Sequence, residues 1–360
     1  MNSGKKFLKK VIALIAAMLM VLCMVFTSGC DNNSQEDDGE QQEKVEAIVY
    51  KDKSIAALVS NIFSKPASNV TEQELASIRY LGISYYDGTY SVTVGFDDYM
   101  KALENKDENS NSLLLRTTTS AITGFEDMKL FKGLKTLNLF NIYTFNDFND
   151  LKYCTELETI SIHTDTKNAA LKKLDGIENL GSLRDFGLYG AIITDLSPLS
   201  SLVELKSLSI GADYRMYEET DENFYDIEAL SELDKLESLS IVFSGVSDLS
   251  PIADAPIKYL SVYRSGLSDI SVLENMTSLE EVSLTYNAIE DVTPLTKLPN
   301  LKFINLDYNY ISDVSPFAKL DRDTIEYVSM DMNSVEDWTP VRDLYEQKKL
   351  YTGYDLYFED

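Results

Sequence analysis

The sequence has very few residues suited to catalysis or metal binding. His163 is the only histidine among the 360 residues. A Ser/His/Asp or Cys/His catalytic set would have to use it, but we expect it at an exposed strand position with no nucleophile nearby. No Cys/His spacing typical of a metal site and no glycine-rich phosphate loop occurs. We therefore expect a protein that is not an enzyme and that has no cofactor and no metal.

Positive charge is also scarce. Lysine and arginine together number 32, against 59 aspartates and glutamates, which gives a net charge of −27. Nucleic-acid phosphates require a basic surface, so we expect no nucleic-acid partner. Docking on an anionic membrane through basic patches is disfavoured for the same reason. The acidity favours solubility, and a basic partner is the alternative explanation for it.

Four lysines stand in the first ten residues, ahead of an apolar run of 16 residues, Val11–Phe26. A basic start, an apolar run and small residues before a cleavage point are typical of a secretory signal peptide. The run is short for a membrane span, which needs about 20 residues. Cys30, directly after Ser28-Gly29, resembles the lipobox cysteine of bacterial lipoproteins, although Thr27 stands where that motif usually has leucine. A plain signal peptide or an uncleaved anchor is the alternative.

The lipobox resemblance implies that residues 1–29 are removed and that Cys30 is diacylated and becomes the mature N-terminus. Residues 31–44 contain no apolar side chain, so they cannot bury anything. We therefore predict that residues 30–44 form a disordered acidic tether. It would hold the rest of the chain at the outer face of the cytoplasmic membrane or at the cell surface, with the lipid as the only contact with the membrane.

Too few cysteines remain for a disulfide. Cys23 leaves with the predicted signal peptide and Cys30 is predicted to be lipidated, so only Cys154 is left as a free thiol. Stability must then come from an apolar core rather than from cross-links. Cys154 stands three residues before Leu157, where the repeat described next requires an apolar group, so we expect it to be a small buried hydrophobe.

The abundant feature of the chain is an internal repeat. Leu279-x-x-Val282-x-Leu284-x-x-Asn287 is followed 22 residues later by Leu301-x-x-Ile304-x-Leu306-x-x-Asn309. This spacing is the signature of a leucine-rich repeat, in which each copy forms one short strand and the copies must stack to bury their apolar positions. About nine copies of 21–31 residues follow one another, and their central strand residues are Leu137, Ile160, Phe186, Leu208, Leu239, Leu260, Val282, Ile304 and Val328.

The pattern predicts a solenoid of the α/β type: a parallel sheet on the concave face, short 3-10 or helical turns on the convex face, and caps at both ends. We assign the repeats to residues 134–341. Turn sequences such as EDVTPLTKL at Glu290 place Asp and Ser/Thr where they can accept hydrogen bonds from free backbone N–H groups, and proline suits the first helical position. Asn287, Asn309 and Asn333 are expected to bond their own turn and the backbone of the next repeat.

Residues 45–133 are predicted to form a helical N-terminal cap. An amphipathic helix starts near Ser54, and Thr71-x-x-Glu74 is a capping box. Tyr85 to Phe96 alternate across Gly88 as in a hairpin, which we interpret as part of an insertion on the cap. Residues 342–360 are predicted to form the C-terminal cap, beginning with a terminal helix.

Aromatic and acidic residues gather on the predicted concave face of the last repeats. Such aromatics are frequent anchors of protein interfaces. The candidate partner-binding residues are Tyr259, Tyr263, Glu281, Tyr286, Phe303, Asp307, Tyr308, Tyr327 and Asp331. The central column of this face is mostly Ser, Gly and Asn, which the inner arc of a curved sheet requires for packing alone. Ala212–Asp226, which lengthens one repeat, is a second candidate for contact with a partner.

Together, the repeat consensus and the cap resemble the internalin-type bacterial leucine-rich repeat proteins over roughly residues 50–345. The resemblance implies recognition of a protein, from the host or from the bacterial surface, through the concave face. We expect a monomer in which the lipid replaces the C-terminal additions common in that family. A lipoprotein that binds carbohydrate or a cell-wall polymer is the alternative, because exposed tyrosines can stack on sugars.

Overall fold

The computed structural model describes residues 47–97, 113–118, 121–165, 168–212, 224 and 226–358, which belong to the compact unit Ala47–Asp360. The predicted signal peptide, Cys30, the tether and nearly all of the 212–226 segment lie outside the described residues. Within the described part of the chain, no helix is long and apolar enough to cross a membrane.

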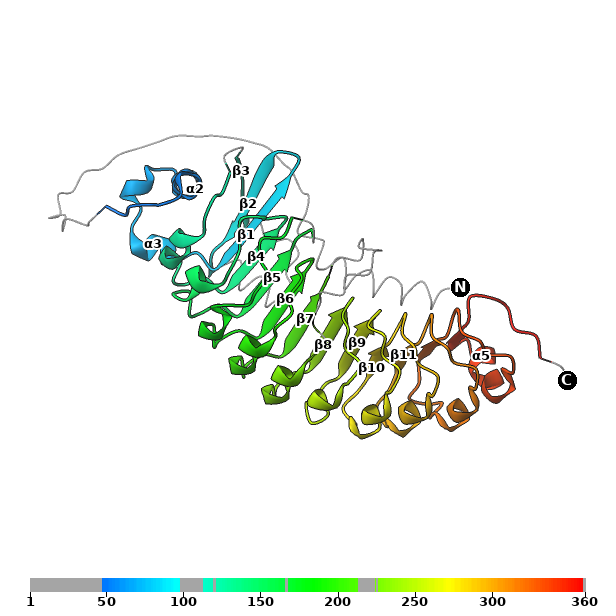
Figure 1. Cartoon of the computed structure of the whole chain (residues 1–360). Helices are drawn as coiled ribbons and strands as arrows, with labels where there is room; N and C mark the ends of the chain where they lie inside the picture. Colours follow the sequence, from blue (N-terminus) through cyan, green and yellow to red (C-terminus); the bar gives the residue numbers. More distant parts are fainter. Residues whose placement is uncertain are drawn as a thin grey trace. The chain divides into compact units, whose positions relative to one another are not determined.

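A single sheet of thirteen strands runs through this unit (Figure 1). The predicted repeat strands are β4 to β12, each parallel to the next and in register: Thr136–Phe140, Thr159–His163, Asp185–Tyr189, Ser207–Gly211, Ser238–Val242, Tyr259–Tyr263, Glu281–Ser283, Phe303–Asn305 and Tyr327–Ser329. The nine predicted central residues face one another across successive strands, so the predicted solenoid fold is confirmed.

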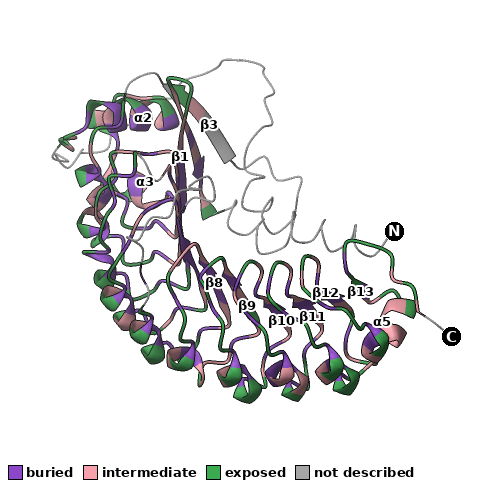
Figure 2. Cartoon of the chain, turned by 45° about the vertical axis from the view of Figure 1, so that its right-hand side comes forward, coloured by how far each residue is buried: buried purple, intermediate pink, exposed green. Residues whose placement is uncertain are grey.

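Short 3-10 turns return the chain from each strand to the next on the outer side of the unit, opposite the strands (Figure 2). They are η2 to η11: Glu126–Leu130, Asn149–Leu151, Ile177–Asn179, Ser197–Ser201, Glu228–Glu232, Ser250–Ile252, Ser271–Asn275, Thr293–Lys297, Ser315–Lys319 and Thr339–Val341. The apolar residues between strand and turn are buried in one continuous core. Cys154 belongs to this core, and burial raises the pKa of its thiol to about 12, as expected for an inert thiol.

An aspartate starts most of these turns in the predicted way. Asp291 Oδ1 accepts a hydrogen bond from the backbone N–H of Thr293 at 2.8 Å, and Asp195, Asp248, Asp313 and Asp337 repeat this bond two residues ahead at the same distance. Where proline is present it occupies the second residue of the turn rather than the predicted first, because Ser or Thr must donate the first N–H to the aspartate.

The N-terminal part contains the predicted helices, α2 (Lys53–Phe63) and α3 (Glu72–Ala76), separated by η1 (Ala67–Asn69). The capping box is present: Glu74 N–H donates to Thr71 Oγ1, and Thr71 N–H donates to Glu74 Oε2. The hairpin around Gly88 joins β1 (Tyr80–Tyr86) to β2 (Thr89–Gly95), and β3 (Leu113–Thr118) follows. Since β1 also pairs with β4, the hairpin and β3 continue the repeat sheet at its N-terminal edge in antiparallel fashion.

The C-terminal end also adds to the sheet. After the short helix α5 (Arg342–Glu346), the chain forms β13 (Leu350–Tyr351), which pairs with β12. The sheet therefore extends beyond the last copy of the repeat consensus. The segment that follows packs back on α5: the Phe358 ring lies 5.8 Å from that of Tyr345 and 5.3 Å from the Arg342 guanidinium.

The asparagine ladder joins the repeats, but in the direction opposite to our expectation. Asn309 Nδ2 donates to Leu306 O in its own turn and to Leu284 O in the preceding repeat, both at 2.9 Å, and its Oδ1 accepts from Ile289 N–H at 3.0 Å. Asn287 and Asn333 make the corresponding bonds. The prediction that they bond the next repeat was wrong, because each side chain points toward the repeat that precedes its own.

Two buried carboxylates join the beginning and the end of the N-terminal cap. Asp127 is 1% exposed and accepts hydrogen bonds from the backbone N–H groups of Lys51 and Asp52. Asp52 in turn accepts from the N–H of Ser54 at the start of α2 and from Thr123 N–H at 2.7 Å. Burial raises the pKa of Asp52, but these hydrogen bonds outweigh it and hold the pKa below its usual value of 3.8.

A lowered pKa in the folded state has a definite consequence for stability. The contribution of ionised Asp52 is fully present above the unfolded-state pKa and is lost as the pH falls through the lower folded-state pKa. We expect the melting temperature to drop less between pH 7 and pH 2 in Asp52→Asn than in the wild type, because the variant has no carboxylate to protonate. Thermal unfolding followed by circular dichroism measures both drops. The same drop in both proteins would contradict this role of Asp52.

Candidate interaction surface

The inner face of the sheet carries no lysine or arginine on its outward-pointing strand positions. These positions stand one residue before, one after and three after each central apolar residue of β4 to β12, and most of them are small or polar. The only charged residues among them are acidic: Asp185, Glu281, Asp307 and Asp331. Three of these four lie in the last three repeats, so this part of the inner face presents negative charge alone.

The N-terminal ends of the strands, two residues before each central residue, form what we call the start edge of the sheet. Unlike the inner face, this edge carries both basic and acidic residues. Its residues are Arg79, Lys135, Glu158, Arg184, Lys206, Glu237, Lys258, Glu280, Lys302 and Glu326. Opposite charges on neighbouring strands form ion pairs, including Lys258–Glu237 at 2.7 Å and Lys302–Glu280 at 2.6 Å. Exposed pairs of this kind contribute little to stability, but they pair most of the charges on this edge, where six basic residues stand against four acidic ones. We did not foresee this ladder, although the alternation of charge at one repeat position is visible in the sequence.

The end edge of the sheet carries a row of aromatic rings, which we call the aromatic row: Phe243, Tyr263, Tyr286 and Tyr308. Its ring centroids lie 5.3, 5.4 and 4.0 Å apart from one ring to the next. Tyr286 and Tyr308 are stacked with only 9° between their planes, and each is 38% exposed. The row therefore joins four consecutive repeats, β8 to β11, into one partly exposed aromatic surface.

Three members of this row occupy a strained backbone conformation. Phe243, Tyr286 and Tyr308 have φ values of 52°, 59° and 57°, in the left-handed region that bulky residues rarely adopt. The corresponding residue of an earlier repeat is Gly190, with φ 84°, which meets the same turn geometry without that cost. The turn thus requires the conformation but not the aromatic side chain. Asn141, Arg264 and Met332 have the same conformation at this position, so it belongs to the turn of the repeat.

A second aromatic column lies on the inner face before the central residues. Tyr259 is 45% exposed, and Phe303 and Tyr327 are half-buried. The strand register places Glu281 between Tyr259 and Phe303, and Phe303 directly beside Tyr327. Thus the structure places the predicted residues Tyr259, Tyr263, Glu281, Tyr286, Phe303, Tyr308 and Tyr327 on adjoining positions of β9 to β12.

Tyr351 extends this surface and was missed by the sequence analysis. It is 49% exposed and pairs with Ser329 across β12 and β13. Its place in the central column is otherwise filled by Ser or Asn in β9 to β12. The repeat consensus ends before it, so only the alternation of apolar and polar residues around Leu350 could have indicated a strand there.

Asp307 and Asp331 adjoin each other, but they do not have the same environment. Asp307 Oδ1 accepts hydrogen bonds of 2.7 Å from both Ser329 Oγ and Asp331 N–H. Burial raises the pKa of Asp307, and these bonds oppose the rise. Asp307 therefore holds β11 and β12 together independently of any partner, whereas the Asp331 carboxylate accepts from the N–H of its neighbour Met332.

His163 is not at an exposed position, contrary to our expectation. It is half-buried between two aromatic rings of neighbouring repeats, with centroid distances of 6.1 Å to Phe140 and 4.8 Å to Tyr189. Stacking across the parallel strands covers the imidazole. Among the described residues, no group of His, Cys, Asp or Glu side chains is arranged to hold a metal ion.

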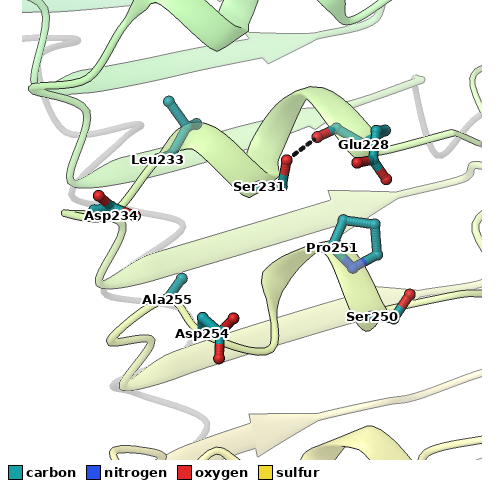
Figure 3. A pocket seen from close by; sticks show the side chains of 8 residues that line it. All are labelled: Glu228, Ser231, Leu233, Asp234, Ser250, Pro251, Asp254 and Ala255. Carbon is teal, nitrogen blue, oxygen red and sulfur yellow. Dashed lines mark hydrogen bonds between the residues drawn. The ribbon is translucent and has the colours of Figure 1, made fainter.

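A shallow hollow lies on the convex side between η6 and η7 and is lined by Glu228, Ser231, Leu233, Asp234, Ser250, Pro251, Asp254 and Ala255 (Figure 3). Ser231 Oγ donates to Glu228 O at 2.7 Å, which closes one turn of η6. The hollow contains acidic side chains but no aromatic ring, and it lies away from the inner face. It is therefore not our candidate site.

The family model described as leucine rich repeats, in two copies, matches residues 277–319, which include β10 and β11 and the turns that follow them. Folds of this family generally serve as recognition scaffolds without catalytic activity. A search of curated proteins finds no match.

Among solved structures, internalin C2 of Listeria monocytogenes is 26% identical, with 50% of this chain and 74% of that chain covered and a TM-score of 0.41. Internalin F of the same organism is 16% identical over 86% of this chain and 96% of that chain, with a TM-score of 0.49. The ectodomain of the Arabidopsis receptor kinase HAESA, solved with a peptide hormone, is 18% identical over 57% and 36%, with a TM-score of 0.44.

Proposed function

We propose that this chain is a surface lipoprotein that recognises a protein partner through the inner face of its leucine-rich repeat sheet. The observation that carries the proposal is the contrast between the two edges of the sheet. The start edge carries basic and acidic residues that form ion pairs with one another, whereas the end edge exposes stacked tyrosines beside inner-face strand positions whose charged residues are all acidic. Partly exposed tyrosines that are already fixed in position lose little entropy on binding and are frequent hot spots of protein interfaces.

The test is a pull-down from bacterial and host surface extracts with the full chain in mild detergent as bait. We expect a protein that is retained by the wild type and lost with a Tyr259/Phe303/Tyr327 triple alanine variant. Equal retention by the triple variant would remove the inner face from consideration. In a second assay, binding of the chain to purified wall glycans is measured. Affinity for the glycans in place of a protein would favour the carbohydrate alternative.

The proposed location rests on Cys30. The signal-like run followed by Ser28-Gly29 motivates the prediction that Cys30 is acylated. Labelled palmitate fed to the producing cells should be incorporated into the wild type and not into Cys30→Ala, as measured by fluorography of the purified chains. Cys154→Ala is the matched control and should be labelled like the wild type, since Cys154 is buried in the core. Equal labelling of Cys30→Ala would refute the lipid anchor.

A further inference from the structure

We propose that the inner face of β9 to β12 binds an extended segment of its partner that is rich in lysine or arginine. This inference rests on the proposed function and adds the chemistry of the partner. The surface concerned lies between the aromatic row and the column formed by Tyr259, Glu281, Phe303 and Tyr327. Asp331 has in its repeat the position that Tyr263 has in the repeat of β9.

The charges on this surface indicate that the bound segment is positively charged. Every charged side chain on the outward positions of the inner strands is acidic, and the nearest strand lysines, Lys258 and Lys302, are paired with glutamates on the start edge. Opposite potentials on two partners speed their association, whereas like charges brought together at an interface are costly. An acidic segment would therefore be disfavoured, and a basic one would meet the carboxylates of Glu281 and Asp331. The exposed Arg264, whose guanidinium lies 5.4 Å from the Phe243 ring, is a cation beside this surface, and the acidic positions outnumber it.

The geometry of the rings disfavours sugar as the occupant. A sugar stacks on the flat face of an aromatic ring, but Tyr286 has Tyr308 stacked at 4.0 Å and the Tyr263 ring at 5.4 Å. The Tyr286 ring and one face of the Tyr308 ring are therefore already in contact with neighbouring rings. The phenol oxygens can accept hydrogen bonds from the N–H groups of lysine and arginine, and their stems can pack on the aromatic surface.

The size of the surface indicates the length of the segment. Neighbouring strands lie about 4.8 Å apart, so the four steps from β8 to β12 span roughly 19 Å, which an extended chain crosses in about six residues. A segment lying across the repeats can thus contact the aromatic row and both acidic positions. A compact domain is not needed to reach all of them.

A peptide selection tests the inference. Random ten-residue peptides displayed on phage are selected against the full chain in detergent, and the affinity of the enriched peptides is measured by fluorescence polarisation. We expect enrichment of sequences with at least two lysines or arginines. Their affinity should fall about tenfold in the double variant Glu281→Gln/Asp331→Asn. Enrichment of neutral or acidic sequences only, or of none, would overturn the inference.

The control removes the same charge from the convex side. Glu228→Gln/Asp254→Asn changes two acids that line the hollow of Figure 3, and it should leave the affinity within about twofold of the wild type. Equal losses in both double variants would mean attraction to net charge alone and would overturn the inference. If the natural partner binds both charge variants normally but not the triple aromatic variant, this inference fails while the proposed function stands.

Discussion

Replacing Phe303 or Tyr327 by alanine is expected to weaken partner binding more than tenfold. The two residues are direct neighbours on β11 and β12, and both are half-buried by the sheet before any partner arrives. Truncating an aromatic residue near the centre of an interface typically costs about 2 kcal/mol or more, whereas changes at the rim cost little, and 1.4 kcal/mol corresponds to a tenfold change in affinity. The measurement is the affinity for the protein obtained in the pull-down, by surface plasmon resonance.

Two comparisons make this result specific. Lys297→Ala changes an exposed residue of the convex turn η9 and should leave the affinity unchanged. Circular dichroism melts of the Phe303 and Tyr327 variants should show the domain still folded at the assay temperature. If these folded variants bind as tightly as the wild type, the surface of β11 and β12 does not contact the partner.

Asn309→Ala is expected to lower the free energy of unfolding by about 1–3 kcal/mol, because stranding buried polar groups has this cost. Asn309 is 4% exposed. Its amide satisfies the Leu284 and Leu306 carbonyls and the Ile289 N–H, so alanine would leave buried groups of two repeats without partners. Urea unfolding of the wild type and the variant gives the difference directly.

Ser265→Ala provides the matched comparison at the same repeat position. The Ser265 hydroxyl accepts from Ser244 Oγ and donates to Tyr263 O at 3.3 Å, so it satisfies one backbone group rather than several. Its loss should cost clearly less than that of Asn309. A larger destabilisation from Ser265→Ala would show that the asparagine ladder does not hold the repeats together.

Much of this molecule follows from local chemistry. The central residues Leu137 to Val328 mark the strands because one apolar residue at a fixed place in each copy has to be buried by stacking. Likewise, Asp291 and its equivalents act on an N–H only two residues away, so the sequence suffices to place them. The helices of the cap were predictable for the same reason, since the bond from Glu74 N–H to Thr71 spans a single turn.

The sequence by itself determined the repeat, its period and its capping, all of which depend on residues close together in the chain. The tertiary structure decided which distant side chains meet. Tyr286 and Tyr308 are 22 residues apart, yet their rings are 4.0 Å apart, because parallel strands bring identical repeat positions side by side. Only stacking shows that Asn309 reaches backwards, that β13 extends the sheet and that the two edges carry opposite chemistry. These features arise between repeats, where register rather than spacing along the chain sets the distances.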